Sequence, residues 1–181
     1  ASGPWVNDVL SNYFGIKHKK KLRLVKGSHL ITKKLYEQDI AFTLQNDDKR
    51  IIFVIPYKKE FTLIGTTEIE VMDPNNPKIN NDEIDYLITS VNNFFVKKIS
   101  ANDIIDTFSG IRPLIDDFKE SSRISRDYYF DLNTDSNLSP LLNIYGGKLT
   151  TYRILSEKAL ISLKKFLPHM KKVSWTHNRK L

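Results

Sequence analysis

Short apolar runs separated by polar turns dominate the first third of the chain, after one segment with helical spacing. The helical segment is Val6–Phe14. The strand-like runs that follow are Leu22–Leu24, His29–Ile31, Ile40–Gln45, Ile51–Tyr57 and Phe61–Thr67. Consecutive short strands joined by short polar turns predict an antiparallel sheet of at least four strands.

The pattern changes after the break Pro74-Asn75-Asn76-Pro77. Asn81-Asp82-Glu83 is typical of a helix start. The apolar positions that follow recur at helical spacing: Ile84, Leu87, Ile88, Val91, Phe94 and Phe95. This spacing predicts a helix over residues 82–95, packed on the sheet.

Strand signals return in the second half of the chain. They cover Ile104–Gly110, Tyr128–Leu132 and Leu141–Tyr145, and a helix is expected over Ile154–Phe166. Residues 173–181 show no clear organisation. Strands grouped apart from helices indicate an α+β fold.

Composition excludes some chemistry. The chain of 181 residues has no cysteine, which rules out disulfides and thiolate catalysis, and no histidine pair has metal-ligand spacing, so we expect no metal site. The net charge is +7, with a basic cluster over Lys17–Arg23 and Lys26 beyond it. We interpret that cluster as a solvated loop. There are two alternatives: the cluster binds nucleic-acid phosphates, or it contacts an anionic membrane surface.

The segment Gly146–Arg153 carries the clearest chemical signal. It follows an apolar strand and precedes the last helix, so its glycines, its lysine and its two threonines lie at a helix N-terminus. Such a turn offers N–H groups and a cation to an anion or an electron-rich carbonyl. The alternative is a glycine-rich turn with an exposed lysine.

Three further residues are candidates. Arg112 follows Gly110-Ile111 at a strand end and could present a planar fork to a carboxylate or a phosphate, or form a structural salt bridge. Arg126, which has Asp127 beside it, could hold a phosphate or form a surface ion pair that contributes little. His29, ahead of a strand, is a candidate general base or a hydrogen-bonded structural histidine. We expect Arg112, Arg126, Lys148 and His29 to face one solvent-open concavity.

The chain contains no G-x-G-x-x-G, so by itself it lacks the usual means of holding a dinucleotide. Its first residues, Ala1–Val6, have the character of a strand exit that enters a helix. We therefore expect a fragment whose partner sequence lies upstream.

Seven motifs in this order resemble the FAD-dependent (aerobic) glycerol-3-phosphate dehydrogenases, among the D-amino-acid-oxidase and glycine-oxidase-like flavoproteins. The motifs are Ala1–Val6, Leu24–His29, Phe53–Tyr57, Phe61–Thr67, Ser109–Leu114, Ser125–Tyr128 and Tyr145–Arg153. The resemblance runs nearly end to end. Asp106 departs from it, because it stands where the family usually has tryptophan.

The resemblance implies an antiparallel substrate domain interleaved with an FAD-binding domain whose Rossmann half is missing from this chain. Residues 1–21 would be a remnant of the FAD-binding domain and a linker, and residues 22–132 the substrate domain. Residues 133–170 would be the returning strand and helix of the FAD-binding domain, and residues 171–181 a tail.

The resemblance also implies roles. Gly110, Gly147, Lys148, Leu149 and Thr150 would contact FAD, and Arg112 and Arg126 would hold glycerol 3-phosphate. His29 would take the proton of the C2 hydroxyl, with Lys148 as its rival. The reaction would give dihydroxyacetone phosphate and pass electrons to quinone.

The isolated chain is expected to be inactive and to bind FAD weakly or not at all, because the upstream FAD-binding segment is a missing partner. A binding module that keeps the fold without catalysis is the alternative function. We expect a cytoplasmic protein with a peripheral contact on the inner face of the membrane, and no nucleic-acid partner.

Overall fold

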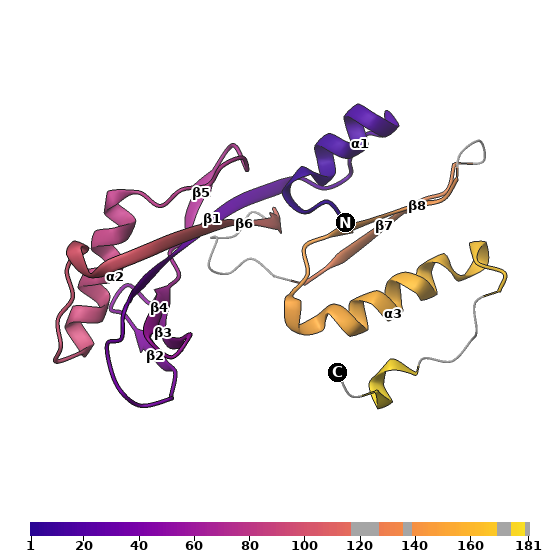
Figure 1. Cartoon of the computed structure of the whole chain (residues 1–181). Helices are drawn as coiled ribbons and strands as arrows, with labels where there is room; N and C mark the ends of the chain where they lie inside the picture. Colours follow the sequence, from indigo (N-terminus) through magenta and orange to yellow (C-terminus); the bar gives the residue numbers. More distant parts are fainter. Residues whose placement is uncertain (117–126, 136–138, 170–174, 180–181) are drawn as a thin grey trace. The chain divides into compact units, whose positions relative to one another are not determined.

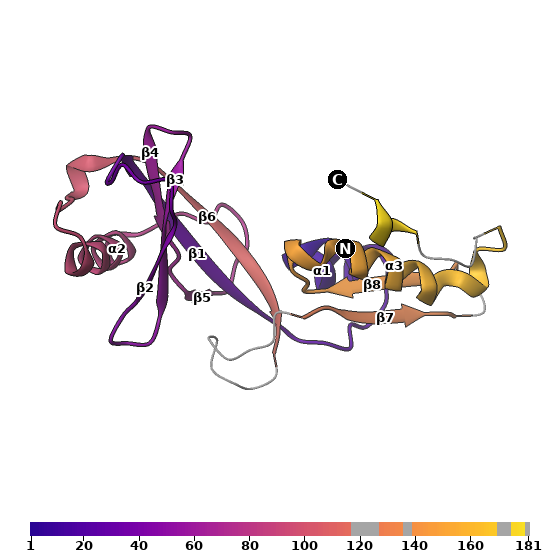
Figure 2. The same cartoon turned by 90° about the horizontal axis from the view of Figure 1, so that it is seen from below.

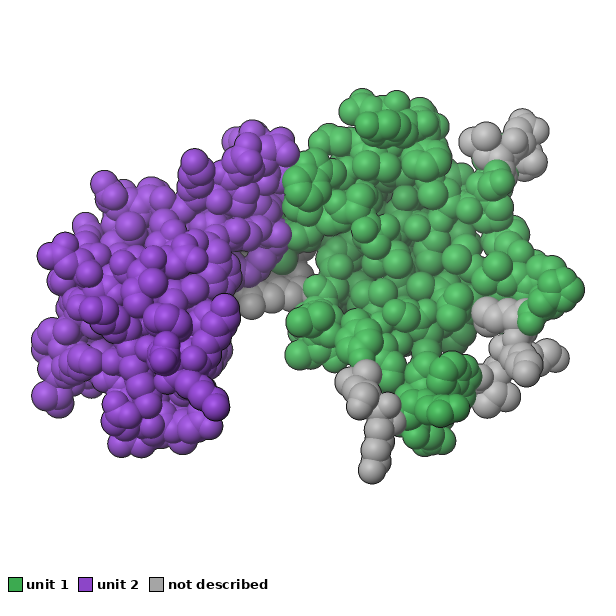
Figure 3. All heavy atoms as spheres, in the orientation of Figure 1, with its two compact units in different colours: residues 1–23, 113–119, 124–181 green, residues 24–112, 120–123 purple. Residues whose placement is uncertain are grey.

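The computed structural model describes residues 1–116, 127–135, 139–169 and 175–179. The chain divides into two compact units, coloured separately in Figure 3. Unit 1 comprises residues 1–23, 113–119 and 124–181, and unit 2 comprises residues 24–112 and 120–123. The boundaries between the units fall inside two long strands, β1 (Leu22–Lys33) and β6 (Ile104–Ile115).

An antiparallel sheet forms the body of unit 2 (Figure 1). Besides β1 and β6 it contains β2 (Phe42–Gln45), β3 (Ile51–Tyr57), β4 (Phe61–Gly65) and β5 (Ile69–Val71). The strand order is β2-β3-β4-β1-β5, and β6 also pairs with β1. Gly65 of β4 lies opposite both His29 of β1 and Phe53 of β3.

Helix α2 (Asn81–Phe94) covers one face of this sheet (Figure 2). Leu87 and Val91 of α2 are fully buried against strand residues. The buried cluster is Leu30, Leu35, Leu44, Ile52, Val54, Ile64, Leu87, Val91 and Ile99. The predicted sheet of at least four antiparallel strands with a packed helix is therefore confirmed.

Local expectations for the sheet needed four corrections. The pieces Leu22–Leu24 and His29–Ile31 are parts of one strand of 12 residues, because the Lys26-Gly27-Ser28 stretch that suggested a break is paired and buried. Strand β4 ends at Gly65 rather than Thr67, and β5 was not expected. Strand β6 continues beyond Gly110 to Ile115.

Unit 1 contains the N-terminal helix and the last strands and helix. Its elements are η1 (Gly3–Trp5), α1 (Val6–Phe14), β7 (Tyr129–Asn133), β8 (Leu141–Tyr145), η4 (Leu149–Thr151), α3 (Tyr152–Leu163), η5 (Lys164–Phe166) and η6 (Thr176–Asn178). β7 and β8 form an antiparallel pair. The short turn η6 corrects the expectation that the tail has no organisation.

The core of unit 1 joins α1 to β8. Val6, Leu10 and Tyr145 are buried together, and Ile16, Leu22, Ile115 and Leu141 pack against them. By contrast, α3 buries none of its residues, and Ile161 on this helix is 61% exposed. The small core of unit 1 thus lies at the α1 side of β8, and α3 does not contribute to it.

The division into compact units does not show what each segment does. The roles expected for residues 1–21, 22–132, 133–170 and 171–181 therefore stay a prediction. Within the described part of the chain, no helix is both long enough and apolar enough to cross a membrane.

A matched pair of valines tests the core of unit 2. Val91 is fully buried on α2, whereas Val96, just past the helix, is 97% exposed. Val91→Ala removes two buried methyl groups and leaves a cavity, so it should lower the free energy of unfolding by about 2 kcal/mol. Val96→Ala should change it by less than about 0.5 kcal/mol. Urea unfolding followed by circular dichroism measures both, and equal effects would contradict the packing of α2.

Candidate active site

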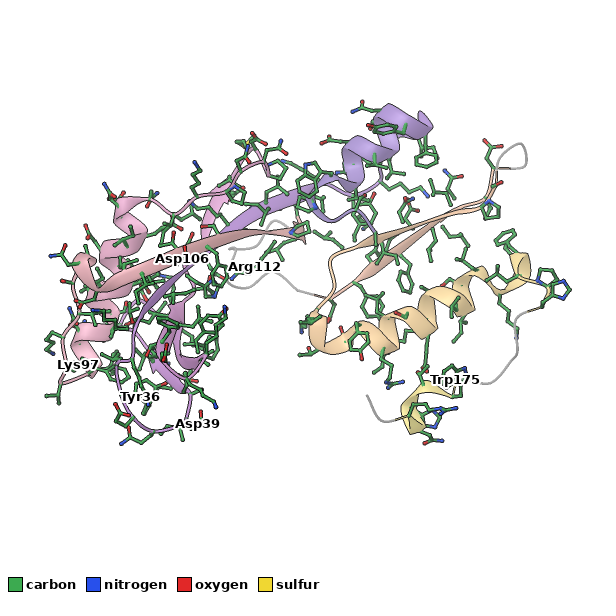
Figure 4. All side chains as sticks on the ribbon, in the orientation of Figure 1. Tyr36, Asp39, Lys97, Asp106, Arg112 and Trp175 are labelled. Atoms are coloured by element: carbon green, nitrogen blue, oxygen red, sulfur yellow. The ribbon has the colours of Figure 1, made fainter. Side chains whose placement is uncertain are left out.

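Arg112 approaches the backbone of β1 at a glycine. Its Nη2 donates a hydrogen bond to Thr66 Oγ1 over 3.1 Å. A Cβ atom added at Gly27 would lie 2.5 Å from Arg112 Nη2 and 2.6 Å from Thr66 Oγ1. Only glycine therefore leaves the guanidinium in place. Figure 4 labels Arg112 on β6, together with Asp106, whose side chain is exposed.

His29 occupies the neighbouring position on the same face of β1. Its ring stacks on Phe108 of β6, with centroids 4.6 Å apart and planes 8° from parallel. A Cβ atom added at Gly65 would lie 2.2 Å from His29 Cδ2, so the imidazole sits directly over that glycine. A ring held between a glycine backbone and an aromatic face has little freedom to turn.

The pKa of His29 lies below its ordinary value, first because the ring is partly buried and then because Arg112 is nearby. Both effects disfavour the imidazolium form. The buried Nδ1 has no hydrogen-bond partner among the described residues. Because Nδ1 is buried, Nε2 is the ring nitrogen that faces a ligand, and it can accept a proton in the tautomer that carries the ring proton on Nδ1.

Lys148 belongs to unit 1, at the turn that links β8 to α3. Gly146 and Gly147 ahead of it have φ angles of 67° and 104°. Lys148 is the residue before η4, and its carbonyl accepts hydrogen bonds from the N–H and the hydroxyl of Thr151. Its Nζ lies 3.8 Å from Asp127 Oδ1, and both side chains are substantially exposed.

The residues predicted to contact the cofactor at this turn are open to solvent. Gly147, Lys148, Leu149 and Thr150 are all exposed. Thr150 also lines a cavity of about 580 Å³ in unit 1, together with Tyr152 and Arg153 of α3 and Trp175 (labelled in Figure 4). The turn is therefore an uncovered surface of unit 1 that other groups can approach.

The structure brings together two of the predicted site residues. Arg112 and His29 are neighbours in unit 2, and Lys148 lies in unit 1. Arg126 falls outside the described residues. Gly110 is exposed on β6, with no atom within 4 Å of an added Cβ. The convergence of Arg112, Arg126, Lys148 and His29 on one concavity stays a prediction.

Sequence reasoning missed four members of this cluster: Gly27, Gly65, Thr66 and Phe108. The signal for the glycines was present, because a glycine inside a strand pattern indicates a bulge or the close approach of another group. Phe108 carried no such signal. Its role depends on the pairing of β6 with β1, which joins residues about eighty positions apart.

The basic cluster is largely engaged within the protein. Lys19 Nζ lies 2.8 Å from Asp131 Oδ1, and Arg23 and Lys21 lie 3.6 and 3.8 Å from Asp116. Lys20 lies over the ring of Tyr129. Lys26 is buried and does not belong to the surface cluster at all. The interpretation of the cluster as a solvated loop stays a prediction.

Among the residues that the structure describes, no three histidine, aspartate or glutamate side chains are placed to hold a metal ion. The chemistry of the Arg112–His29 site is that of a hydrogen-bonding guanidinium beside a neutral imidazole.

The family described as FAD dependent oxidoreductase (DAO) matches residues 1–153. The chain belongs to this family. The resemblance found in the seven motifs is thereby confirmed, and the family is one of flavin-dependent oxidoreductases.

Curated relatives narrow the comparison. The chain is 46% identical to the aerobic glycerol-3-phosphate dehydrogenase of Escherichia coli (strain K12), over 90% of this chain and 33% of that protein. It is 44% identical to the D-erythritol 1-phosphate dehydrogenase of Brucella abortus (strain 2308), over 99% of this chain and 36% of that protein. The chain thus spans about a third of the length of these relatives.

A solved structure has a similar fold. It is the glycerol-3-phosphate dehydrogenase from Bacillus halodurans complexed with FAD, with a TM-score of 0.78 and 30% sequence identity. The match covers 97% of this chain and 33% of that chain. Both units of this member of the DAO family therefore have counterparts in a flavoprotein.

The surroundings of His29 predict the pKa of its ring, which a titration can measure. Its pKa should lie below 6.5, and Arg112→Gln should raise it by removing a nearby positive charge. Between the folded pKa of His29 and its ordinary pKa of 6.5, the unfolded chain binds more protons than the folded chain. The contribution of His29 to stability is therefore full above about pH 6.5 and is lost as the pH falls through the folded pKa.

Nuclear magnetic resonance titration of the His29 ring measures both values. A pKa of His29 at or above 6.5 would show that burial does not govern the ring. An unchanged pKa in Arg112→Gln would show that the guanidinium is not close to it.

Proposed function

We propose that this chain is part of a flavoprotein that oxidises sn-glycerol 3-phosphate to dihydroxyacetone phosphate. Removal of a hydride from C2 and of the proton from its hydroxyl converts the alcohol to the ketone. The observation that carries the proposal is the pair of Arg112 and His29, held on one face of unit 2 over Gly27 and Gly65.

Arg112 is assigned to the phosphate. A guanidinium can donate two parallel hydrogen bonds to phosphate oxygens, and the hydrogen bond from Nη2 to Thr66 fixes its orientation. By resemblance, Arg126 is a second phosphate ligand. Because glycerol 3-phosphate and D-erythritol 1-phosphate are both phosphate esters of polyols, this anchor suits either substrate.

His29 is assigned to the proton of the C2 hydroxyl. Its lowered pKa keeps the imidazole neutral near pH 7, which is the form that accepts a proton. The stack on Phe108 holds the ring in one plane. Lys148 is the rival base, and its Nζ lies 3.8 Å from Asp127 Oδ1 in unit 1.

The turn after β8 fits a flavin. Gly147 to Thr150 are exposed, and the Leu149 side chain is 88% exposed, so that an aromatic ring system has room to lie against the turn. FAD, when bound, supplies the acceptor of the hydride. Lys148 at this turn would place positive charge where negative charge develops on the reduced flavin.

The remaining partners follow from the same proposal. A segment that this chain lacks would contribute the loop for the FAD pyrophosphate, and quinone would receive the electrons at the cytoplasmic face of the membrane. A catalytically inactive module that keeps the fold is the alternative function, and the experiments below distinguish it from an enzyme.

The first experiment measures flavin affinity. The 181-residue chain has no G-x-G-x-x-G, so its dissociation constant for FAD should be above about 1 µM. Titration followed by flavin fluorescence gives the value. Joining the chain to the flanking segments of the Escherichia coli relative, in place of the matching third, should restore tight binding. Tight binding by the chain alone would contradict the assignment of the pyrophosphate loop to another segment.

The second experiment uses that chimera, called here the completed enzyme. Arg112→Ala should lower kcat/KM for glycerol 3-phosphate by about 10- to 100-fold, the loss expected for hydrogen bonds to a charged group. FAD should stay bound, because Arg112 is not assigned to the cofactor. Arg50→Ala is the matched control, since Arg50 pairs with Asp48 on another part of unit 2.

The same assay with D-erythritol 1-phosphate identifies the preferred polyol phosphate. A completed enzyme that holds FAD and oxidises neither ester would favour the inactive module. Unchanged kcat/KM in Arg112→Ala would remove Arg112 from the substrate site.

A further inference from the structure

A buried polar network lies behind the face that carries Arg112 and His29. Successive side chains of a strand point to opposite faces of the sheet. On β1, Gly27 and His29 face the candidate site, so Lys26 and Ser28 face the other side, toward α2. Lys26, Ser28, Thr67 and Glu83 are all buried there.

Glu83 of α2 is the centre of this network. Its Oε1 accepts hydrogen bonds from Ser28 Oγ over 2.8 Å and from Thr67 Oγ1 over 2.6 Å. Its Oε2 lies 2.8 Å from Lys26 Nζ and accepts a bond from the Asn80 N–H over 2.9 Å. A side chain that is 2% exposed thus receives four polar contacts.

The network continues to β6. Ser28 Oγ lies 2.8 Å from Ser109 Oγ. Because the single hydroxyl proton of Ser28 is donated to Glu83, Ser109 is the donor in this pair. One carboxylate therefore connects α2, β1, the residues after β4 and β6.

Each hydroxyl bound in the network is adjacent in sequence to a residue of the candidate site. Ser28 stands between Gly27 and His29, Thr67 follows Thr66, and Ser109 follows Phe108. The Ser28 N–H also donates to Thr67 Oγ1 over 3.0 Å, which ties β1 directly to the segment that orients Arg112. A shift of any one of these hydroxyls moves its neighbour on the opposite face.

The carboxylate form of Glu83 is favoured. Burial alone would raise its pKa, but the hydrogen bonds from Lys26, Thr67, Asn80 and Ser28 outweigh burial, and the pKa lies below its ordinary value. Lys26 Nζ also donates to the Lys78 carbonyl over 2.6 Å, so the ion pair is satisfied on both sides. The network is therefore complete, and a complete network is rigid.

We propose that Glu83 is a positioning residue for the oxidation of the phosphate ester. Through the hydroxyls of Ser28, Thr67 and Ser109 it fixes Gly27, Thr66 and Phe108, and through these it fixes Arg112 and His29. Glu83 contacts neither substrate nor cofactor. This inference rests on the proposed function of the Arg112–His29 pair.

Glu83 also has a structural role that the test must separate. It forms a capping box with Asn80 at the start of α2, so its loss weakens the helix as well as the network. Asn80→Ala removes the other half of the box, the Asn80 side chain that accepts from the Glu83 N–H. It leaves the contacts of Glu83 with Ser28 and Thr67 intact.

The test compares four variants of the completed enzyme. Glu83→Gln and Thr67→Val break the network, the second with the β-branched shape of the side chain kept. Both should lower kcat/KM for glycerol 3-phosphate at least tenfold, with KM raised at least fivefold because the guanidinium of Arg112 loses its fixed position. Thr67→Ser keeps the hydroxyl and Asn80→Ala lowers stability alone, so both should keep at least half of wild-type kcat/KM.

Two outcomes would overturn the proposal. Thr67→Val with wild-type kcat and KM would show that the network does not position the site, even if Glu83→Gln fails to fold. Equal losses in Asn80→Ala and Glu83→Gln, at temperatures where both are folded, would show that Glu83 acts only through the stability of α2.

A second readout is independent of turnover. In the 181-residue chain, Thr67→Val should raise the pKa of His29 toward its ordinary value, because a loosened β1 admits water to the ring, and Thr67→Ser should not. If the wild-type completed enzyme oxidises neither ester, the proposed function fails while this titration still tests the positioning role. An unchanged His29 pKa in Thr67→Val contradicts that role directly.

Discussion

A buried charge pair, Lys26 with Glu83, constrains the elements of unit 2 around it. The two charges lie 2.8 Å apart, and each is also bound by groups from the surrounding chain. Removing one partner of such a pair leaves an uncompensated charge in the core and typically costs about 3–5 kcal/mol. Helix α2 and strand β1 must therefore keep their relative position. The residues on the other face of β1 are held in place by the same constraint.

The apolar pattern was sufficient for the sheet and for α2, because strands β2, β3 and β4 and the helix each carry their own periodicity. It failed at Lys26-Gly27-Ser28, where a charge, a glycine and a hydroxyl suggest a turn. There the tertiary contacts with Glu83 and with Arg112 satisfy groups that a local analysis assigns to solvent. For the same reason the roles of Gly27 and Gly65 were missed. These roles depend on the side chains of Arg112 and His29, which lie against the two glycines.

The residue types of the candidate site could be chosen from the sequence, but the contacts between these residues could not. Arg112 and His29 were expected to face one concavity with Arg126 and Lys148, but the pairing of β6 with β1 that makes Arg112 and His29 neighbours is specified by no local signal. Lys148 was predicted from glycines, a lysine and a helix start, all of which are local, and the structure places it at such a turn. Local chemistry is thus readable from sequence, whereas contacts across a sheet need the fold.

Two relatives of similar identity are named for different polyol phosphates, one of glycerol and one of erythritol. The glycine positions under Arg112 and His29 bear on how such a difference can arise during evolution. The backbone of β1 at Gly27 touches Arg112 and that of β4 at Gly65 touches His29, so neither leaves room for new bulk beneath these side chains. In the proposed function, a longer polyol is therefore accommodated by residues around Arg112 and His29 rather than beneath them.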